Sequence, residues 1–281
     1  MSTERVAVWS DGRARTVDAA APVVGAFDLG LGRGDGCFES VLVTGGTTPR
    51  LEPHLARLRR SAGLMELTHP GDDAVRAVVA AVVEGWPADV EAACRVFLTR
   101  GLGDGTPPTL LALLAAVPAA TLRQRAEGIR VVSLSLGVPA GFRATAPWLL
   151  GGAKTLSYAV NMAAYRHAHA LGADDVVFTS LEGQLLEGPT STVVWAADGR
   201  LHTPPVETGI LAGTTQARLF AAAEADGWPT AVTAGTVEDL GSADAVWLLS
   251  GIRGAAAVVQ LDGAARGDAG LTARVRGLLS R

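Results

Sequence analysis

Lysine is almost absent from this chain of 281 residues. Lysine and arginine together number 24, and Lys154 is the only lysine, so arginine supplies nearly all of the positive charge. Arginine stays protonated and cannot act as a nucleophilic amine, whereas lysine can. The one lysine is therefore a candidate for amine chemistry, and the plain alternative is a surface lysine that remained by chance.

Cysteine and long apolar runs are also scarce. Cys37 and Cys94 do not make a disulfide framework, and with five scattered histidines they do not suggest a metal cluster. No uncharged apolar stretch of about 18 residues occurs, and the first residues lack the apolar core of a signal peptide. We expect a cytoplasmic protein with no metal and no membrane partner.

Aromatic residues make up only 5% of the chain, the net charge is −4, and no long basic run appears. Nucleic-acid binding is therefore a poor interpretation. Hydrophobic residues at 48% and charged residues at 19% are typical of a packed globular protein.

The hydrophobic pattern predicts alternating strands and helices of an α/β protein. In the first part we expect strands at 38–43, 94–99 and 109–117 and helices at 52–65 and 72–86. A polar helical stretch near 118–128 marks a domain boundary, which gives domains 1–120 and 121–281. In the second part we expect strands at 129–136, 175–180, 192–197, 245–250 and 255–261 and helices at 156–171, from 214 and at 270–280. Strands outnumber helices there, which favours a barrel-like sheet flanked by helices.

Small residues surround Lys154, since Gly151, Gly152 and Ala153 precede it. They let a bulky group approach the backbone closely. Tyr158 and Asn161 follow at four and seven residues, so a helix through this segment would place both beside the lysine amine. The alternative is that Tyr158 is a core residue with a satisfied hydroxyl.

Two further segments contain candidate cofactor-binding groups. Glu187 lies in a turn of small hydroxyl residues between apolar strands, where a buried carboxylate needs a cationic partner such as a protonated pyridine nitrogen. Thr214 and Thr215 open a predicted helix whose free N–H groups make an anion site. The alternatives are an exposed turn glutamate and an ordinary threonine cap.

Five segments in this order resemble the class IV aminotransferases, the fold-type IV family that uses pyridoxal phosphate. They are RGDGCFESVLV (33–43), HLARL (54–58), AKTLSYAVNMAA (153–164), LEGPTSTVV (186–194) and GILAGTTQ (209–216). The resemblance implies a two-domain fold, with a small N-terminal α/β domain and a larger C-terminal barrel-like α/β domain. It also implies a homodimer, a small-molecule amine substrate and pyridoxal 5'-phosphate as cofactor.

The resemblance also implies residue roles. Lys154 would carry the cofactor as a Schiff base and move the substrate proton, and Glu187 would keep the pyridine nitrogen protonated. The remaining cofactor-binding candidates are Arg57 with Gly213, Thr214 and Thr215 for the phosphate, Tyr158 for the ring oxygen, and Thr192. The family often has Asn in place of Thr192 and Arg in place of Gln216, which leaves the tuning of the site open.

Five residues are candidates for substrate binding: Phe38, Glu39, Arg100, Ser250 and Arg253. Arg253 would suit a substrate carboxylate. The alternative is an arginine in a surface loop.

Three functions compete. The segments GDGCF and Thr99-Arg100-Gly101 look closest to aminodeoxychorismate lyases, which make 4-aminobenzoate and pyruvate for folate synthesis. A transaminase for D-amino or branched-chain amino acids is the second reading. Glu39 keeps it open, although 101–108 lacks the Arg-x-His carboxylate trap of the D-amino-acid enzymes. The third reading is a non-catalytic cofactor-binding homologue, and the intact lysine and glutamate argue against it.

Overall fold

The computed structural model describes residues 4–103 and 105–280. The chain divides into two compact units, the first made of Met1–Pro118 with Ala153–Ser157 and the second of Ala119–Gly152 with Tyr158–Arg281. The expected division at 120/121 stays a prediction. The lysine segment 153–157 packs within the first unit, which no feature of the local sequence indicated.

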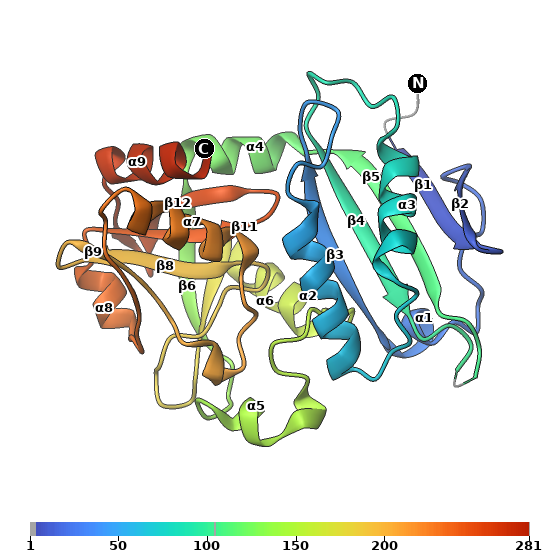
Figure 1. Ribbon diagram of the computed structural model, residues 1–281. Helices are drawn as coiled ribbons and strands as arrows, with labels where there is room; N and C mark the ends of the chain where they lie inside the picture. The colour runs from blue at the N-terminus through green and yellow to red at the C-terminus, as the bar shows by residue number, and fades with distance from the viewer. Residues whose placement is uncertain (1–3, 104, 281) are drawn as a thin grey trace. The chain divides into compact units, whose positions relative to one another are not determined.

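An antiparallel sheet of five strands forms the first unit (Figure 1). The strands are β1 (Glu4–Ser10), β2 (Arg13–Val17), β3 (Gly36–Val43), β4 (Ala92–Thr99) and β5 (Thr109–Ala116), in the order β2-β1-β5-β4-β3. Helices α2 (Leu51–Leu64) and α3 (Asp72–Val83) cover one face, and the short helix α1 (Leu29–Arg33) precedes β3. Strand β3 therefore lies at an edge of the sheet.

Helical spacing of apolar residues explains the two covering helices. Val75, Val78 and Val82 are buried on α3, and Leu55 and Leu58 are buried on α2. Both helices were predicted, and each ends earlier than expected. Helix α3 ends at Val83, and Glu84 after it has the non-helical backbone angles φ −50° and ψ 122°.

Eight strands make a mixed sheet in the second unit. They are β6 (Ile129–Ser135), β7 (Asp175–Thr179), β8 (Thr192–Ala197), β9 (Arg200–Thr203), β10 (Thr230–Val232), β11 (Ala245–Ser250), β12 (Gly254–Leu261) and β13 (Ala264–Ala265). Their order is β10-β9-β8-β11-β12-β6-β7, with β13 paired to β12. The pairs β6–β7, β6–β12 and β9–β10 are parallel, and the others are antiparallel.

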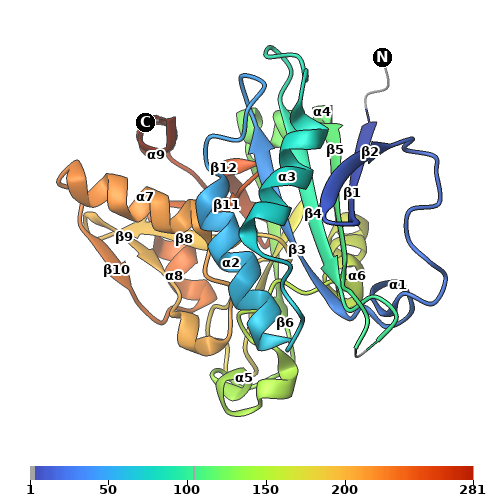
Figure 2. The same ribbon diagram turned by 45° about the vertical axis from the view of Figure 1, so that its right-hand side comes forward.

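The helices of the second unit are α4 (Ala119–Glu127), α5 (Phe142–Thr145), α6 (Ala159–Ala170), α7 (Thr214–Ala225), α8 (Val237–Ser242) and α9 (Ala269–Ser280), with 3-10 turns at Pro147–Leu149 and Val206–Thr208. Successive side chains of a strand face opposite sides of a sheet. Val194 and Trp247 accordingly pack with α7 and α9, whereas Trp195 and Leu248 pack with Leu240 of α8. Helices α7 and α8 lie on opposite sides of strands β8 and β9 (Figure 2). Among the described residues no helix is long and apolar enough to cross a membrane.

Asp28 ties the loop before β3 to the neighbouring strands. Its buried carboxylate caps α1 by accepting from the Gly30 N–H at 2.8 Å. The hydroxyls of Thr99 and Thr109 donate to the same carboxylate at 2.9 and 2.6 Å. One side chain therefore satisfies a helix terminus and joins it to the ends of β4 and β5.

Replacing Asp28 with alanine leaves two hydroxyls and one N–H without this acceptor. We expect the free energy of unfolding in urea to fall by about 2–3 kcal/mol. The control is Asp18→Ala, which removes an exposed carboxylate that accepts from the nearby Ala20 N–H. It should cost less than about 0.5 kcal/mol. Equal losses in the two variants would contradict a stabilising role for the Asp28 cluster.

Candidate active site

Lys154 lies on a short extended segment along the edge of β3. The Phe38 N–H donates to the Lys154 carbonyl at 3.0 Å, and the Leu156 N–H donates to the Gly36 carbonyl at 2.8 Å. A side chain at Gly36 would meet Leu156 Cδ1 and the Leu98 carbonyl at 2.7 Å each, so this close approach requires glycine. The Lys154 N–H also donates to Ser61 Oγ at 3.0 Å, which fixes the backbone against α2.

The Lys154 side chain is buried against an aromatic ring. Its Nζ lies 4.5 Å from the centroid of the Phe38 ring, and Phe38 stacks on Phe97 with centroids 5.9 Å apart. Only 8% of Lys154 is exposed. The face of an aromatic ring attracts a cationic amine, so this contact holds the lysine side chain in one place. The side chain of the only lysine is thus held in a defined position by its neighbours.

The neighbouring thiol is not a competing nucleophile. Burial raises the pKa of Cys37 to about 12, and the negative charge of Glu39 acts in the same direction. The thiolate is the nucleophilic form of cysteine, so Cys37 is inert near neutral pH.

The condition that would place Tyr158 and Asn161 beside the lysine amine, a helix through Lys154, is not met, and the helix expected at 156–171 spans Ala159–Ala170. Residues 153–157 pair with β3, and α6 begins only at Ala159, with Tyr158 as its N-cap. Lys154, Tyr158 and Asn161 therefore do not share a helical face. Strand pairing with residues more than 100 positions away overrides the local helical pattern.

Arg57 is held by a buried ion pair. Its Nε donates to Glu39 Oε1 at 2.6 Å and its Nη2 donates to Oε2 at 2.8 Å. His54 Nδ1 lies 2.7 Å from the same Oε2. All three side chains are at least nine-tenths buried. Burial alone raises the pKa of the Glu39 carboxyl, but the hydrogen bonds and charge of Arg57, with a further contribution from His54, lower it to about 2.

Glu187 lies in the second unit, in the turn between β7 and β8. Its carbonyl accepts from the Phe178 N–H at 2.9 Å, which extends the pairing of β7. Its carboxylate Oε2 accepts from the Leu211 N–H at 3.0 Å, and Arg143 Nη1 lies 4.0 Å from Oε1. A partly exposed carboxylate held by a backbone amide and close to a cation is suited to a cationic ring nitrogen.

The turn that contains Glu187 is held by α6. Asn161 donates to the Pro189 carbonyl at 2.6 Å, and the Tyr165 hydroxyl lies 2.7 Å from Thr190 Oγ1. Asn161 and Tyr165 are four residues apart and so lie on one face of the helix. The Ser191 hydroxyl in the same turn is buried and makes no hydrogen bond.

The N-terminus of α7 is open to an anion. Gly213 is the N-cap residue, and no side chain caps the helix there. A Cβ at Gly213 would lie 2.3 Å from Thr192 Oγ1, so only glycine fits beside that buried threonine. Thr214 and Thr215 form the first turn, where backbone N–H groups and the helix dipole favour a phosphate.

The arginine candidates for substrate binding have structural partners. Arg100 donates to Asp35 at 2.7 Å and to the Met65 carbonyl at 2.8 Å. Arg253 donates to the fully buried Asp175 at 2.5 Å. Such pairs hold a guanidinium in place, and a substrate carboxylate would have to compete with them.

The other three substrate candidates lie beside residues already described. Ser250 Oγ accepts from the Arg253 N–H at 3.3 Å, Phe38 contacts Lys154, and Glu39 contacts Arg57. Substrate binding by all five candidates stays a prediction.

Sequence reasoning missed two positioning residues, Tyr165 and Arg143, and it placed Asn161 beside Lys154, whereas Asn161 donates to the Pro189 carbonyl. Tyr165 could have been recognised by its spacing of four from Asn161. Arg143 had no local signal. Its place depends on the nearby Gly151 and on Gly209, which is distant in sequence, because a Cβ at Gly209 would lie 2.5 Å from Arg143 Cβ and one at Gly151 would lie 2.9 Å from it.

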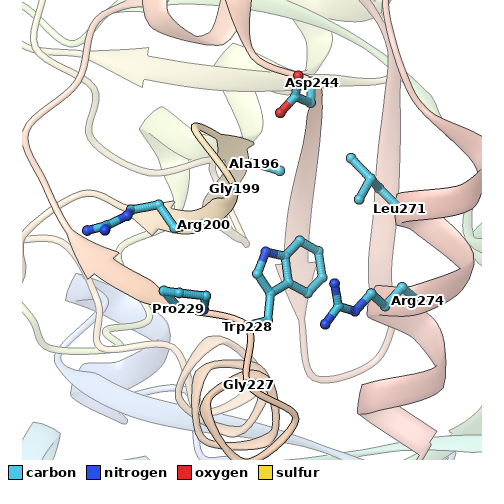
Figure 3. A pocket seen from close by; sticks show the side chains of 9 residues that line it. All are labelled: Ala196, Gly199, Arg200, Gly227, Trp228, Pro229, Asp244, Leu271 and Arg274. Atoms are coloured by element: carbon cyan, nitrogen blue, oxygen red, sulfur yellow. The ribbon is translucent and has the colours of Figure 1, made fainter.

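A cavity of about 240 Å³ in the second unit lies elsewhere (Figure 3). It is lined by Ala196, Gly199, Arg200, Gly227, Trp228, Pro229, Asp244, Leu271 and Arg274. The Arg274 guanidinium lies 4.2 Å from the centre of the Trp228 ring and pairs with Asp226. None of the predicted site residues lines this cavity, so it does not define the candidate active site.

Comparisons with known proteins place the chain in a family. The class IV amino-transferase family matches residues 36–261. A Mycobacterium tuberculosis protein named bifunctional aminodeoxychorismate lyase / D-amino acid transaminase is 43% identical over 251 residues, covering 86% of this chain and 87% of its own length. The chain belongs to the class IV aminotransferase family, and it is an enzyme of that family.

Solved structures agree with this assignment. A hypothetical aminotransferase from Mycobacterium tuberculosis in its PLP-bound form has a TM-score of 0.94 and 40% identity, covering 98% of this chain and 97% of its own. A fold IV transaminase from Curtobacterium pusillum has a TM-score of 0.92 and 40% identity, covering 100% of this chain and 98% of its own. The expected fold-type IV architecture is confirmed.

The Glu39 pair makes stability depend on pH. The ordinary pKa of 4.5 is lowered to about 2 in the folded protein. The charged pair therefore stabilises the fold above pH 4.5, and this contribution is lost as the pH falls from 4.5 towards 2. We expect the stability difference between wild type and Glu39→Gln in urea to narrow by about 1 kcal/mol between pH 5.5 and 3.5. A difference that stays constant over this range would contradict the lowered pKa.

Proposed function

We propose that this enzyme is an aminodeoxychorismate lyase that converts 4-amino-4-deoxychorismate to 4-aminobenzoate and pyruvate. The observation that carries the proposal is the single lysine, buried against Phe38 in a chain of the class IV family. The cofactor is pyridoxal 5'-phosphate. The relative that is 43% identical has a lyase activity in its name, and so do two more distant relatives, from Vibrio harveyi and Bacillus subtilis.

The groups that these residues provide match those that pyridoxal 5'-phosphate requires. An aldehyde needs a buried primary amine, which Lys154 provides, and a protonated pyridine nitrogen needs a carboxylate, which Glu187 provides. A phosphate needs N–H donors and positive charge, which the first turn of α7 and Arg57 provide. The glycine at 213 leaves space at the helix terminus that a Cβ would fill.

The chain's residues would act as follows. When bound, the cofactor supplies an electron-withdrawing ring that acidifies the carbon next to the substrate nitrogen. Lys154 Nζ would hold the cofactor and, once free, would accept the proton from the amine-bearing ring carbon of the substrate. Glu187 would keep the cofactor nitrogen protonated, and Thr192 and Tyr158 would contact the cofactor. The enolpyruvyl group would leave with the electrons of its C–O bond, which makes the ring aromatic, and the proton taken by Lys154 would balance the one that the leaving group takes up to become pyruvate.

Transamination is the second candidate because the same relative is also named a D-amino acid transaminase. The first proton abstraction by Lys154 is shared, and the two reactions differ in where the proton goes next. Branched-chain amino acids are an alternative substrate class, since a more distant relative is named a putative branched-chain-amino-acid aminotransferase. A non-catalytic binding protein is disfavoured, because Lys154 and Glu187 are both present.

The assembly and location belong to the same proposal. We propose a cytoplasmic homodimer that acts in folate biosynthesis. Phe27, Leu31 and Leu102 are 86%, 68% and 65% exposed in the first unit, and apolar groups exposed to this degree suit an interface with a second copy. Both cysteines are free and buried, which suits a reducing compartment.

The decisive assay supplies 4-amino-4-deoxychorismate without a keto acid. We expect release of 4-aminobenzoate, and we expect Lys154→Ala to lower the rate by about 100- to 10,000-fold because the general base is lost. Glu52→Gln, an exposed substitution on α2, serves as the control and should keep the wild-type rate. No release by the wild type, together with amino transfer from D-alanine or a branched-chain amino acid to 2-oxoglutarate, would replace the lyase with a transaminase.

A further inference from the structure

The buried ion pair between Glu39 and Arg57 joins strand β3 to helix α2 through two hydrogen bonds. Glu39 is 2% exposed on β3, and Arg57 is 6% exposed on α2. Both carboxylate oxygens take part, at 2.6 Å from Nε and 2.8 Å from Nη2. This two-bond arrangement fixes the plane of the guanidinium, which a single hydrogen bond does not do.

Stability alone does not explain why an ion pair, and not an apolar pair, is buried at Glu39 and Arg57. Removing two charges from water costs several kcal/mol per ion, and an apolar pair of similar volume is often as stable. What a buried bidentate pair does provide is orientation. His54, one turn before Arg57 on α2, holds Glu39 Oε2 from a second side at 2.7 Å. One helix therefore contacts the carboxylate twice and sets its direction.

Glu39 has little capacity left for a substrate. Oε1 accepts from Arg57, and Oε2 accepts from Arg57 and the Ser40 N–H at 3.3 Å and also contacts His54. Successive residues of a strand face opposite sides, so β3 directs Phe38 to Lys154 and Glu39 to Arg57. One strand thus supports two groups assigned to the cofactor.

We propose that Glu39 is a positioning residue that fixes the plane of the Arg57 guanidinium for binding of the cofactor phosphate, with His54 supporting Glu39. This inference rests on the proposed function, which assigns the phosphate to Arg57. It gives Glu39 a role through Arg57 in place of direct contact with substrate.

The test compares two aldehydes that differ only in the phosphate. Apoenzyme is titrated with pyridoxal 5'-phosphate and with pyridoxal, and binding is followed by the absorbance of the lysine-bound form. We expect Glu39→Gln to raise the Kd for pyridoxal 5'-phosphate roughly tenfold, as when an outer partner that orients a ligand is removed. The Kd for pyridoxal should change less than about twofold. The control Glu52→Gln breaks an exposed pair with Arg76 on the same helix, and it should change neither.

A double-mutant cycle makes the test sharper. In an Arg57→Gln background, Glu39→Gln should have no further effect on the Kd for pyridoxal 5'-phosphate, because its effect passes through Arg57. The double variant also avoids an unpaired buried charge. If Glu39→Gln alone fails to fold, His54→Gln serves in its place because it keeps both charges of the pair. It should raise the Kd for pyridoxal 5'-phosphate by roughly two- to fivefold and leave the Kd for pyridoxal unchanged.

The outcomes separate the two proposals. Suppose that Arg57→Gln weakens the binding of pyridoxal 5'-phosphate but not of pyridoxal. An equal loss of affinity for both aldehydes in Glu39→Gln, or no loss for either, would then overturn the positioning role of Glu39. If Arg57→Gln also treats the two aldehydes alike, the phosphate role of Arg57 fails, and the inference about Glu39 fails with it. A wild-type protein that binds neither aldehyde would overturn the cofactor assignment itself.

Discussion

Two backbone hydrogen bonds, from Phe38 to Lys154 and from Leu156 to Gly36, attach a five-residue segment to the edge of β3. The rest of the candidate site depends on this attachment. It places the only lysine in the first unit, although the residues on both sides of the segment belong to the second. Glycine at position 36 makes the approach possible, and the hydroxyl of Ser61 completes it.

Each unit holds its charged groups in place with its own contacts. In the first unit the Arg57 guanidinium is oriented by Glu39 and His54. In the second unit the Leu211 amide links Glu187 to the loop before α7, and α6 holds the turn through Pro189 and Thr190. Orientation by neighbouring groups is what a charged side chain needs in order to bind a ligand in one pose.

The parts of the fold that could be predicted are those with local causes. Helices α2 and α3 and strands β4, β8 and β11 follow from hydrophobic spacing, and the class IV family was recognisable from five short segments. The pairing of Lys154 with β3 was not predictable, because it depends on contacts between residues far apart in sequence. The position of Arg143 was not predictable either, because it packs against Gly209, far along the chain, as well as against Gly151. Nor was the pairing of Arg253 with Asp175, which begins another strand.

The proposed roles of the other site residues all depend on Lys154 as the residue that binds the cofactor covalently. Borohydride reduction of the protein loaded with pyridoxal 5'-phosphate, followed by digestion and mass spectrometry of the peptides, tests this proposal. We expect one modified peptide, which contains Lys154, at near one cofactor per chain. A modification at any other residue, or none after loading, would contradict it.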